Sequence, residues 1–164
     1  MAQKSISLFF VELGFPLRNV RWSWGSQRDN AVLLRTWADE YSEKDHTVGV
    51  LRPPAIRRQS VSVGLKERVQ QLRALWGGGI AGYAVIAEAK DPGAIPREIK
   101  AYRSDAVFSI ARLELRPDET IIAILSEAVP TSALDTHART HRTQAASGIF
   151  PVTDVNPHAT PQKL

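Results

Sequence analysis

Apolar residues recur at three- and four-residue intervals in two segments, which is the period of an amphipathic helix. The first segment covers residues 5–13, where Ser5 is a suitable N-cap and Gly14 a suitable end. The second lies between a suitable N-cap at Ser62 and three glycines at 77–79. Its expected apolar face consists of Leu65, Val69, Leu72 and Trp76. The polar residues expected largely on its other faces are Lys66, Arg68, Gln71 and Arg73.

Other apolar runs lack this spacing and predict strands. They cover residues 31–37, 48–51, 82–89, 106–115 and 120–128. Turn signals at 91–93 and 117–119 separate the later ones. Because these strands cluster instead of alternating with helices, we expect an α+β fold with a mixed or antiparallel sheet. A small, strongly curved sheet resembling an open barrel, with flanking helices, fits this order.

The chain has 164 residues, of which 43% are apolar, so it has enough apolar surface for the core of one ordinary domain. The periodic pattern ends near residue 136, and the remainder is rich in Thr, Ala, Pro and His. We therefore expect one folded domain over residues 1–135 and a flexible C-terminal tail over residues 136–164.

Charge and composition limit the kinds of partner and of chemical site that this chain can have. The chain carries 21 basic and 17 acidic residues, and the resulting net charge of +4 permits a polyanionic partner without requiring one. It has no cysteine, which excludes disulfides, zinc–thiolate sites and thiol nucleophiles. No apolar run approaches the ~20 residues of a membrane span, and the N-terminus makes a poor signal peptide. We expect a cytoplasmic protein without a membrane partner.

Two groups of residues are of types that bind metal ions or take part in catalysis. His137 and His141 are four apart, but no third ligand is nearby in the sequence, so we expect no metal site. Carboxylates cluster at Asp39, Glu40, Glu43 and Asp45. Two of them could hold magnesium or act as acid and base, although a solvated loop after a strand is the favoured interpretation. A metal-dependent enzyme using Asp39 and Glu40 is therefore the lesser alternative.

Three of the four tryptophans lie within sixteen residues, at Trp22, Trp24 and Trp37, among arginines and small polar residues. Nucleobases stack on indole rings, and guanidinium groups bind phosphate. The segment therefore predicts either a nucleobase pocket with a phosphate-binding wall or simply part of the core. Further basic residues that could follow a phosphate backbone lie at 52–73 and 97–103.

A series of short motifs occurs in a characteristic order. They are residues 19–25 (NVRWSWG), 33–40 (LLRTWADE), 64–68 (GLKER), 82–86 (GYAVI), 89–91 (AKD) and 96–100 (PREIK). This series resembles the N-terminal base-reading domain of modification-dependent HNH restriction endonucleases. That domain belongs to the PUA superfamily, close to the EVE, YTH and ASCH domains. The resemblance covers roughly residues 5–135.

The resemblance implies an open barrel with a pocket for a flipped nucleotide carrying 5-methylcytosine or 5-hydroxymethylcytosine. The base-pocket residues that it implies are Trp22, Ser23, Trp24, Trp37 and Asp39, and a carboxylate such as that of Asp39 could accept the cytosine amino proton. The residues expected to bind phosphate are Arg21, Arg57, Arg58, Lys66, Arg68, Arg97 and Lys100.

The chain departs from this family because no HNH pattern follows the resemblance. We therefore expect a binding module for double-stranded DNA with a modified cytosine, without catalysis, metal or cofactor. A separately encoded nuclease is a compatible partner. An RNA-binding module of the same fold, reading a modified RNA base, remains the alternative.

Overall fold

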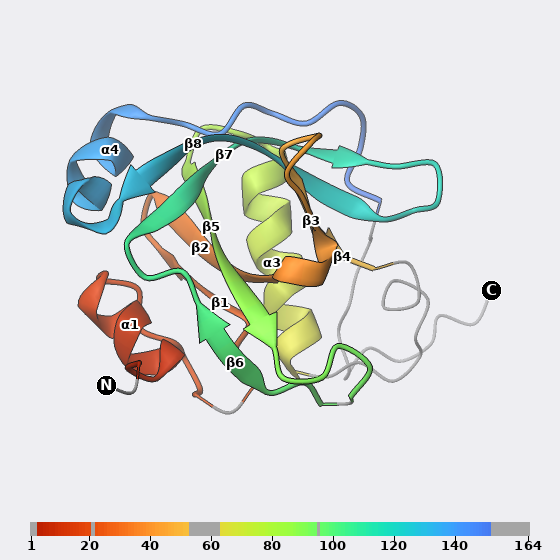
Figure 1. Cartoon of the computed structure of the whole chain (residues 1–164). Helices are drawn as coiled ribbons and strands as arrows, with labels where there is room; N and C mark the ends of the chain where they lie inside the picture. The colour runs from red at the N-terminus through yellow and green to blue at the C-terminus, as the bar shows by residue number, and fades with distance from the viewer. Residues whose placement is uncertain (1–2, 21, 53–62, 95, 152–164) are drawn as a thin grey trace.

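The computed structural model describes residues 3–20, 22–52, 63–94 and 96–151. The described elements are α1 (Ile6–Glu12), β1 (Gly25–Arg28), β2 (Ala31–Trp37), a 3-10 turn (Ala38–Glu40), β3 (Tyr41–Ser42), β4 (Thr47–Leu51), α3 (Val63–Trp76), β5 (Ala81–Ala89), β6 (Ile99–Tyr102), β7 (Ala106–Leu115), β8 (Ile121–Pro130), a second 3-10 turn (Thr131–Ala133) and α4 (Leu134–Thr140). Figure 1 shows their arrangement. The longest of the described helices, α3, has 14 residues, and none combines the length and apolar character needed to cross a membrane.

The apolar patterns predicted most of these elements. The two expected helices are confirmed as α1 and α3, and the five expected strands as β2, β4, β5, β7 and β8. The sequence analysis missed β1, β3, β6 and α4. Strands β1 and β3 have only four and two residues, which is too short for a periodic pattern, and β1 (GSQR) is mostly polar.

The strands described form one mixed sheet with the order β1-β2-β5-β7-β8-β4-β3, and β6 pairs with β5. Strands β2 and β5 are parallel, and the other pairs are antiparallel. This arrangement confirms the α+β class with an open, mixed sheet and flanking helices.

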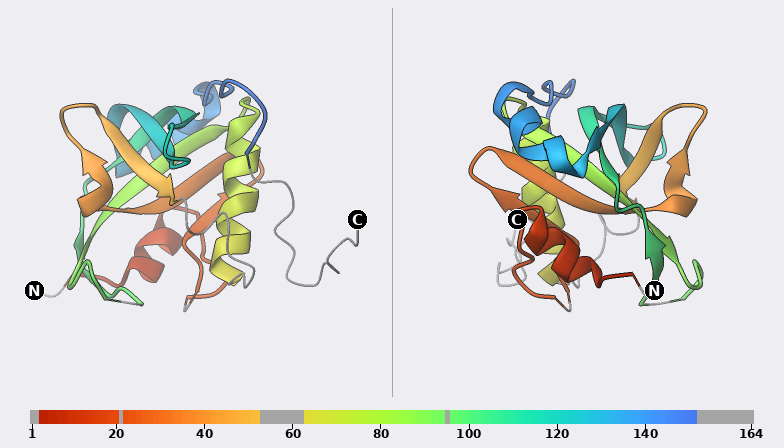
Figure 2. Two further views of the ribbon diagram at one scale, coloured as in Figure 1. Left: turned by 90° about the vertical axis from the view of Figure 1, so that its right-hand side faces the viewer. Right: turned by 60° about the vertical axis from the view of Figure 1, so that its left-hand side comes forward.

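The sheet bends so far that β2 and β4 come close together. Strands β2 and β4 are separated in the hydrogen-bonding order by β5, β7 and β8. Nevertheless, the guanidinium group of Arg68 binds the backbone of Arg35 on β2 and of Val50 on β4. Register shifts along β7–β8 and β4–β8 are the kind of irregularity that strengthens twist and bending. In the two views of Figure 2, α3 lies alongside the bent sheet.

The sheet is covered on both faces. Val32 and Leu34 of β2 belong to the cluster around α3, whereas Ala31 and Leu33 belong to the cluster with Phe9 and Phe10 of α1 and residues of α4. Successive side chains of a strand point to opposite faces, so a strand buried on both faces is a continuous apolar run. This explains why β2 and β5 lack an alternating pattern.

Helix α3 buries a wider face than predicted. Leu65, Val69 and Leu72 are buried as expected, but Arg68 and Gln71, which were expected largely on the other faces, are also buried. The assignment of these two residues to a solvent-facing surface was wrong, because the sheet bends around α3 and covers it from two sides. The helix ends as predicted at the glycines.

The folded part of the chain extends beyond the predicted boundary at residue 136. Helix α4 crosses that boundary, with Leu134 and Ala138 both buried. Beyond it, Thr143 is buried and bonded to the backbone of Ile80 and Ile110, and Phe150 packs against Trp76. The part of the expected tail at residues 152–164 lies outside the described residues.

Candidate functional site

A pocket of about 500 Å³ opens where the ends of β2 and β4 approach each other. Its volume falls within the range of about 300–1,000 Å³ that is typical of ligand sites. The described residues that line it are Trp24, Arg35, Thr36, Trp37, Glu40, Gly49, Val50, Leu51, Arg52, Arg68, Pro92, Gly93, Ala94, Pro96 and Arg97. Strand β2, strand β4, helix α3 and the loop between β5 and β6 therefore all contribute to one cavity.

Two indole rings lie in the pocket wall, each half-buried. Trp24 precedes β1, and Trp37 is the last residue of β2. The guanidinium carbons of Arg35 and Arg97 lie 4.7 Å and 5.2 Å from the centre of the Trp37 ring. Cations at these distances are attracted to an indole ring. The wall therefore combines aromatic rings with guanidinium planes, and nucleobases stack on both kinds of surface.

Arg68 holds the backbone around the pocket. The side chain is only 4% exposed and donates hydrogen bonds to the carbonyl oxygens of Val50 (3.0 Å), Trp24 (2.8 Å) and Arg35 (2.6 Å). Burial, and secondly the charge of Arg35, lower the pKa of Arg68 to about 9, so it remains a cation at neutral pH. Its Nη donors are used by the backbone, which indicates that Arg68 positions the pocket walls.

Arg35 supplies positive charge that no described carboxylate pairs with. Its Nε is buried and has no hydrogen-bond partner, and its charge is not matched by an ion pair among the described residues. Burial and the nearby charge of Arg97 lower the pKa of Arg35 to about 10. An unpaired buried donor is costly unless something binds to it. The pocket is therefore chemically suited to an electron-rich ligand.

Asp39 and Glu40 form ion pairs at the rim. Arg97 donates to both carboxylate oxygens of Asp39, at 2.8 Å and 2.9 Å. Arg52 donates to Oε1 of Glu40 and lies 3.6 Å from Asp39. The hydrogen bond from Arg97, the largest cause, holds the pKa of Asp39 below its ordinary value. Such a bidentate pair orients both partners.

The Arg97→Gln substitution should raise the pKa of Asp39 toward the ordinary value. In the wild type, the lowered pKa means that folding favours the ionised carboxylate. The Asp39–Arg97 pair therefore stabilises the fold above the unfolded-state pKa and is lost as the pH falls through the folded-state pKa. A carboxyl carbon NMR titration would measure this. Asp105, whose pKa is lowered by Arg103, is the internal control and should not change. An unchanged Asp39 titration in the variant would contradict the assignment.

The structure brings four of the predicted site residues into the pocket wall, namely Trp24, Trp37, Arg68 and Arg97. Asp39 lies at the rim, with both oxygens bonded to Arg97. Trp22 is half-buried and Ser23 buried, and neither lines the pocket. The Ser23 hydroxyl accepts from the backbone of Asn19 and donates to Glu67, which indicates a local structural role.

Two predicted phosphate ligands lie away from the pocket. Lys66 lies on α3, and Lys100 on β6 is exposed beside Glu88 at 3.5 Å. Arg21, Arg57 and Arg58 lie outside the described residues.

Sequence reasoning missed Arg35, Arg52 and Glu40 as pocket-lining residues of a base site. The available signal for Arg35 was its position as the one charged residue within the apolar run 31–37. Arg52 and Glu40 appeared only as members of broad charged clusters.

Gly64 allows α3 to approach the tryptophan segment. A Cβ atom there would lie 2.5 Å from the Trp22 carbonyl oxygen and 2.6 Å from Nε1 of Trp24. We expect Gly64→Ala to displace Trp24 and to destabilise the fold by about 1–3 kcal/mol, as overpacking does. Thermal melting and tryptophan fluorescence would measure both effects. Gly77→Ala is the control, because its Cβ would meet nothing within 4 Å. Equal melting temperatures for Gly64→Ala and the wild type would disprove this packing argument.

Comparisons with family models, with curated proteins and with solved structures found no match to this chain.

Proposed function

We propose that this protein is a PUA-like binding module for DNA containing a modified cytosine, 5-methylcytosine or 5-hydroxymethylcytosine. In this proposal the modified base is flipped out of the duplex and enters the pocket between β2 and β4, and the module does not cleave the DNA. The observation that carries the proposal is that Trp24 and Trp37, thirteen residues apart in the sequence, line one open cavity together with Arg35, Arg68 and Arg97.

The chemistry of the cavity supports a pyrimidine ligand. Indole rings and guanidinium planes offer stacking surfaces, and stacking must offset the few kcal/mol that unstacking a base costs. Apolar atoms of Val50, Leu51 and Pro96 can contact a methyl group at the base edge. The guanidinium group of half-buried Arg35 lines the pocket and can donate to an acceptor such as a base carbonyl.

Glu40 is the carboxylate best placed to accept the cytosine amino proton. It lines the pocket and its Oε1 binds Arg52, whereas both oxygens of Asp39 are bonded to Arg97. We expect Glu40→Gln to weaken binding of the modified cytosine about tenfold, in line with the 1–3 kcal/mol of one base-edge contact. Competition between duplexes with 5-methylcytosine and thymine at the same position would measure the loss of preference. Lys100→Gln, remote from the pocket, is the matched control. Retained preference in Glu40→Gln would exclude this role.

The ion pairs of Asp39 and Glu40 with arginines support a binding role without catalysis. Magnesium sites use carboxylate oxygens that are free to coordinate the ion. At this rim, Asp39 and Glu40 are both bonded to arginines, so each negative charge is already compensated. This favours an architectural role for the acidic cluster over the metal-dependent enzyme considered from the sequence.

Fluorescence anisotropy with the full chain would test the proposal. The ligands are otherwise identical duplexes with cytosine, 5-methylcytosine or 5-hydroxymethylcytosine at one position, together with an RNA of the same sequence with and without the corresponding modification. We expect tighter binding to a modified DNA duplex. A 2-aminopurine placed beside the target base should brighten on binding, because flipping unstacks it. If all duplexes bound with equal, salt-sensitive affinity, the proposal of base recognition would be wrong, and the protein would bind DNA by electrostatic attraction alone. Preference for the modified RNA would shift it to the RNA-binding alternative.

A further inference from the structure

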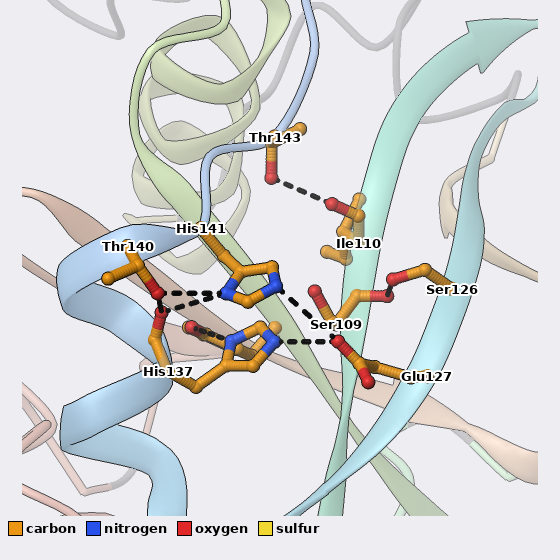
Figure 3. A network of polar contacts seen from close by, with 9 residues as sticks. Ser109, Ile110, Ser126, Glu127, His137, Thr140, His141 and Thr143 are labelled. Carbon is orange, nitrogen blue, oxygen red and sulfur yellow. Dashed lines mark hydrogen bonds and ion pairs between the residues drawn. The ribbon is translucent and has the colours of Figure 1, made fainter.

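Three side chains of kinds that can bind metal ions meet beside α4 (Figure 3). Glu127 lies on β8, His137 on α4, and His141 directly follows α4. One donor atom from each residue lies within 4.8 Å of the other two. None of the three residues lines the pocket described above, so this cluster is independent of the proposed function.

The spacing of the donor atoms suits a small tetrahedral ion. Oε1 of Glu127 lies 2.9 Å from Nε2 of His137 and 3.7 Å from Nε2 of His141. Two ligand atoms that are each about 2.0 Å from a tetrahedral zinc ion are about 3.3 Å apart. The observed distances lie on either side of this value. The His141 side chain is 53% exposed, so a small rotation can equalise them.

The imidazole ring of His141 presents Nε2 toward this cluster. Its Nδ1 lies 3.3 Å from the backbone carbonyl oxygen of His137. The Thr140 hydroxyl group lies 3.2 Å from the same Nδ1. In the tautomer in which Nδ1 donates to the carbonyl oxygen, Nε2 is free to bind a metal ion. A backbone partner on the opposite nitrogen is the usual way in which proteins orient a metal-binding histidine.

His137 is oriented in an equivalent way. Its Nδ1 shares a hydrogen bond of 2.7 Å with the hydroxyl group of buried Tyr83. A tyrosine hydroxyl oxygen can accept a hydrogen bond, so Tyr83 can orient the ring by accepting from Nδ1–H. The two imidazole rings are stacked, with centroids 3.6 Å apart and an interplanar angle of 10°, and Nε2 of each faces the Glu127 carboxylate. Because the lone pairs of parallel rings do not converge, binding of one ion requires the exposed His141 ring to turn. The arrangement includes both the ligands and the groups that orient them.

The geometry points to a zinc site formed by Nε2 of His137, Nε2 of His141 and the carboxylate of Glu127, with a fourth position open to water. Two imidazoles and one carboxylate are a donor set that suits zinc, whereas magnesium and calcium prefer oxygen ligands alone. The ion would replace the proton between His137 and Glu127 and would tie α4 to β8. The sequence analysis expected no metal site because Glu127, the third ligand, lies ten residues before His137.

Isothermal titration calorimetry of the full chain with zinc chloride tests the assignment. We expect one zinc ion per chain and no heat with magnesium chloride. His141→Ala and Glu127→Gln should each lower the zinc affinity at least about tenfold, because each removes or weakens one ligand. Both side chains are more than half exposed, so the fold should survive, as circular dichroism can check. His46→Asn is the matched control, since His46 lies in a separate turn with a positive φ that asparagine tolerates.

Cobalt provides a second readout that does not depend on heat. Bound cobalt(II) should give the visible absorption of a four-coordinate site in the wild type and in His46→Asn, and this absorption should be lost in His141→Ala. Zinc should also raise the unfolding temperature of the wild type, because it binds the folded state. The assignment would be overturned if the wild type did not bind zinc, or if both ligand variants bound it as tightly as the wild type.

Discussion

Replacing Trp37 with alanine is expected to remove the preference for a modified duplex and to weaken its binding by about ten- to a hundredfold. Base–aromatic stacking contributes about 1–3 kcal/mol per base. The guanidinium groups of Arg35 and Arg97 both lie against the Trp37 ring. Its removal therefore disrupts the stacking surface and the position of both cations. Anisotropy titrations with modified and unmodified duplexes measure the change. Trp24→Ala should behave similarly, because Trp24 lines the same cavity.

Trp22→Ala is the matched control for these two variants. Trp22 lies two residues before Trp24 and is also half-buried, but it does not line the pocket. We expect this variant to keep the preference, provided that its melting temperature shows an intact fold. If Trp22→Ala lost the preference while Trp37→Ala kept it, the pocket between β2 and β4 would not be the base site. The sequence alone grouped all three tryptophans together, so this comparison separates the structural assignment from the motif.

Arg68→Met should destabilise the protein by about 3–5 kcal/mol, because each buried carbonyl group that loses its donor costs about 1–3 kcal/mol and Arg68 serves three of them. The substitution leaves the carbonyl groups of Val50 and Arg35 without the donor that bridges β2 and β4. Native domains are stable by only about 5–15 kcal/mol, so the loss is a large fraction of the total. Urea denaturation followed by circular dichroism measures it.

Lys66→Met on the same helix is the control, because Lys66 is only half-buried, and we expect little change there. A conservative Arg68→Lys variant should recover only part of the stability, because an ammonium group cannot reproduce the planar fork that reaches three carbonyls. A loss below about 1 kcal/mol in Arg68→Met would show that the open side of the sheet does not need this bridge.

The fold could be predicted from the sequence where burial produces a hydrophobic pattern over many residues. Strand β2 was predicted at its observed bounds because burial on both faces leaves a mostly apolar run, in which five of the seven residues are buried. Helix α3 was predicted from its spacing and its glycine stop. The short strands β1 and β3 were missed because their pairing depends on β2 and β4, not on any pattern of their own.

The candidate site was predictable only in part. Indole rings are informative from sequence, and two of the three near the N-terminus line the pocket. The roles of the charged residues could not be predicted from the sequence, because an arginine in a helix can face solvent or be buried. Arg68 was expected to bind phosphate, yet its donors go to backbone carbonyls. Arg35 was absent from the expected site, yet its buried Nε lacks a partner.

By itself, the amino-acid sequence determined the α+β class, the main helices and strands, and the presence of an indole- and arginine-rich segment. These follow from local periodicity and residue chemistry, which act over a few residues. Only the tertiary structure decided that β2 and β4 meet around Arg68 to leave a cavity, and that Glu127 meets His137 and His141. Both depend on how far the sheet bends and where α4 packs, and those are set by the balance of many distant contacts.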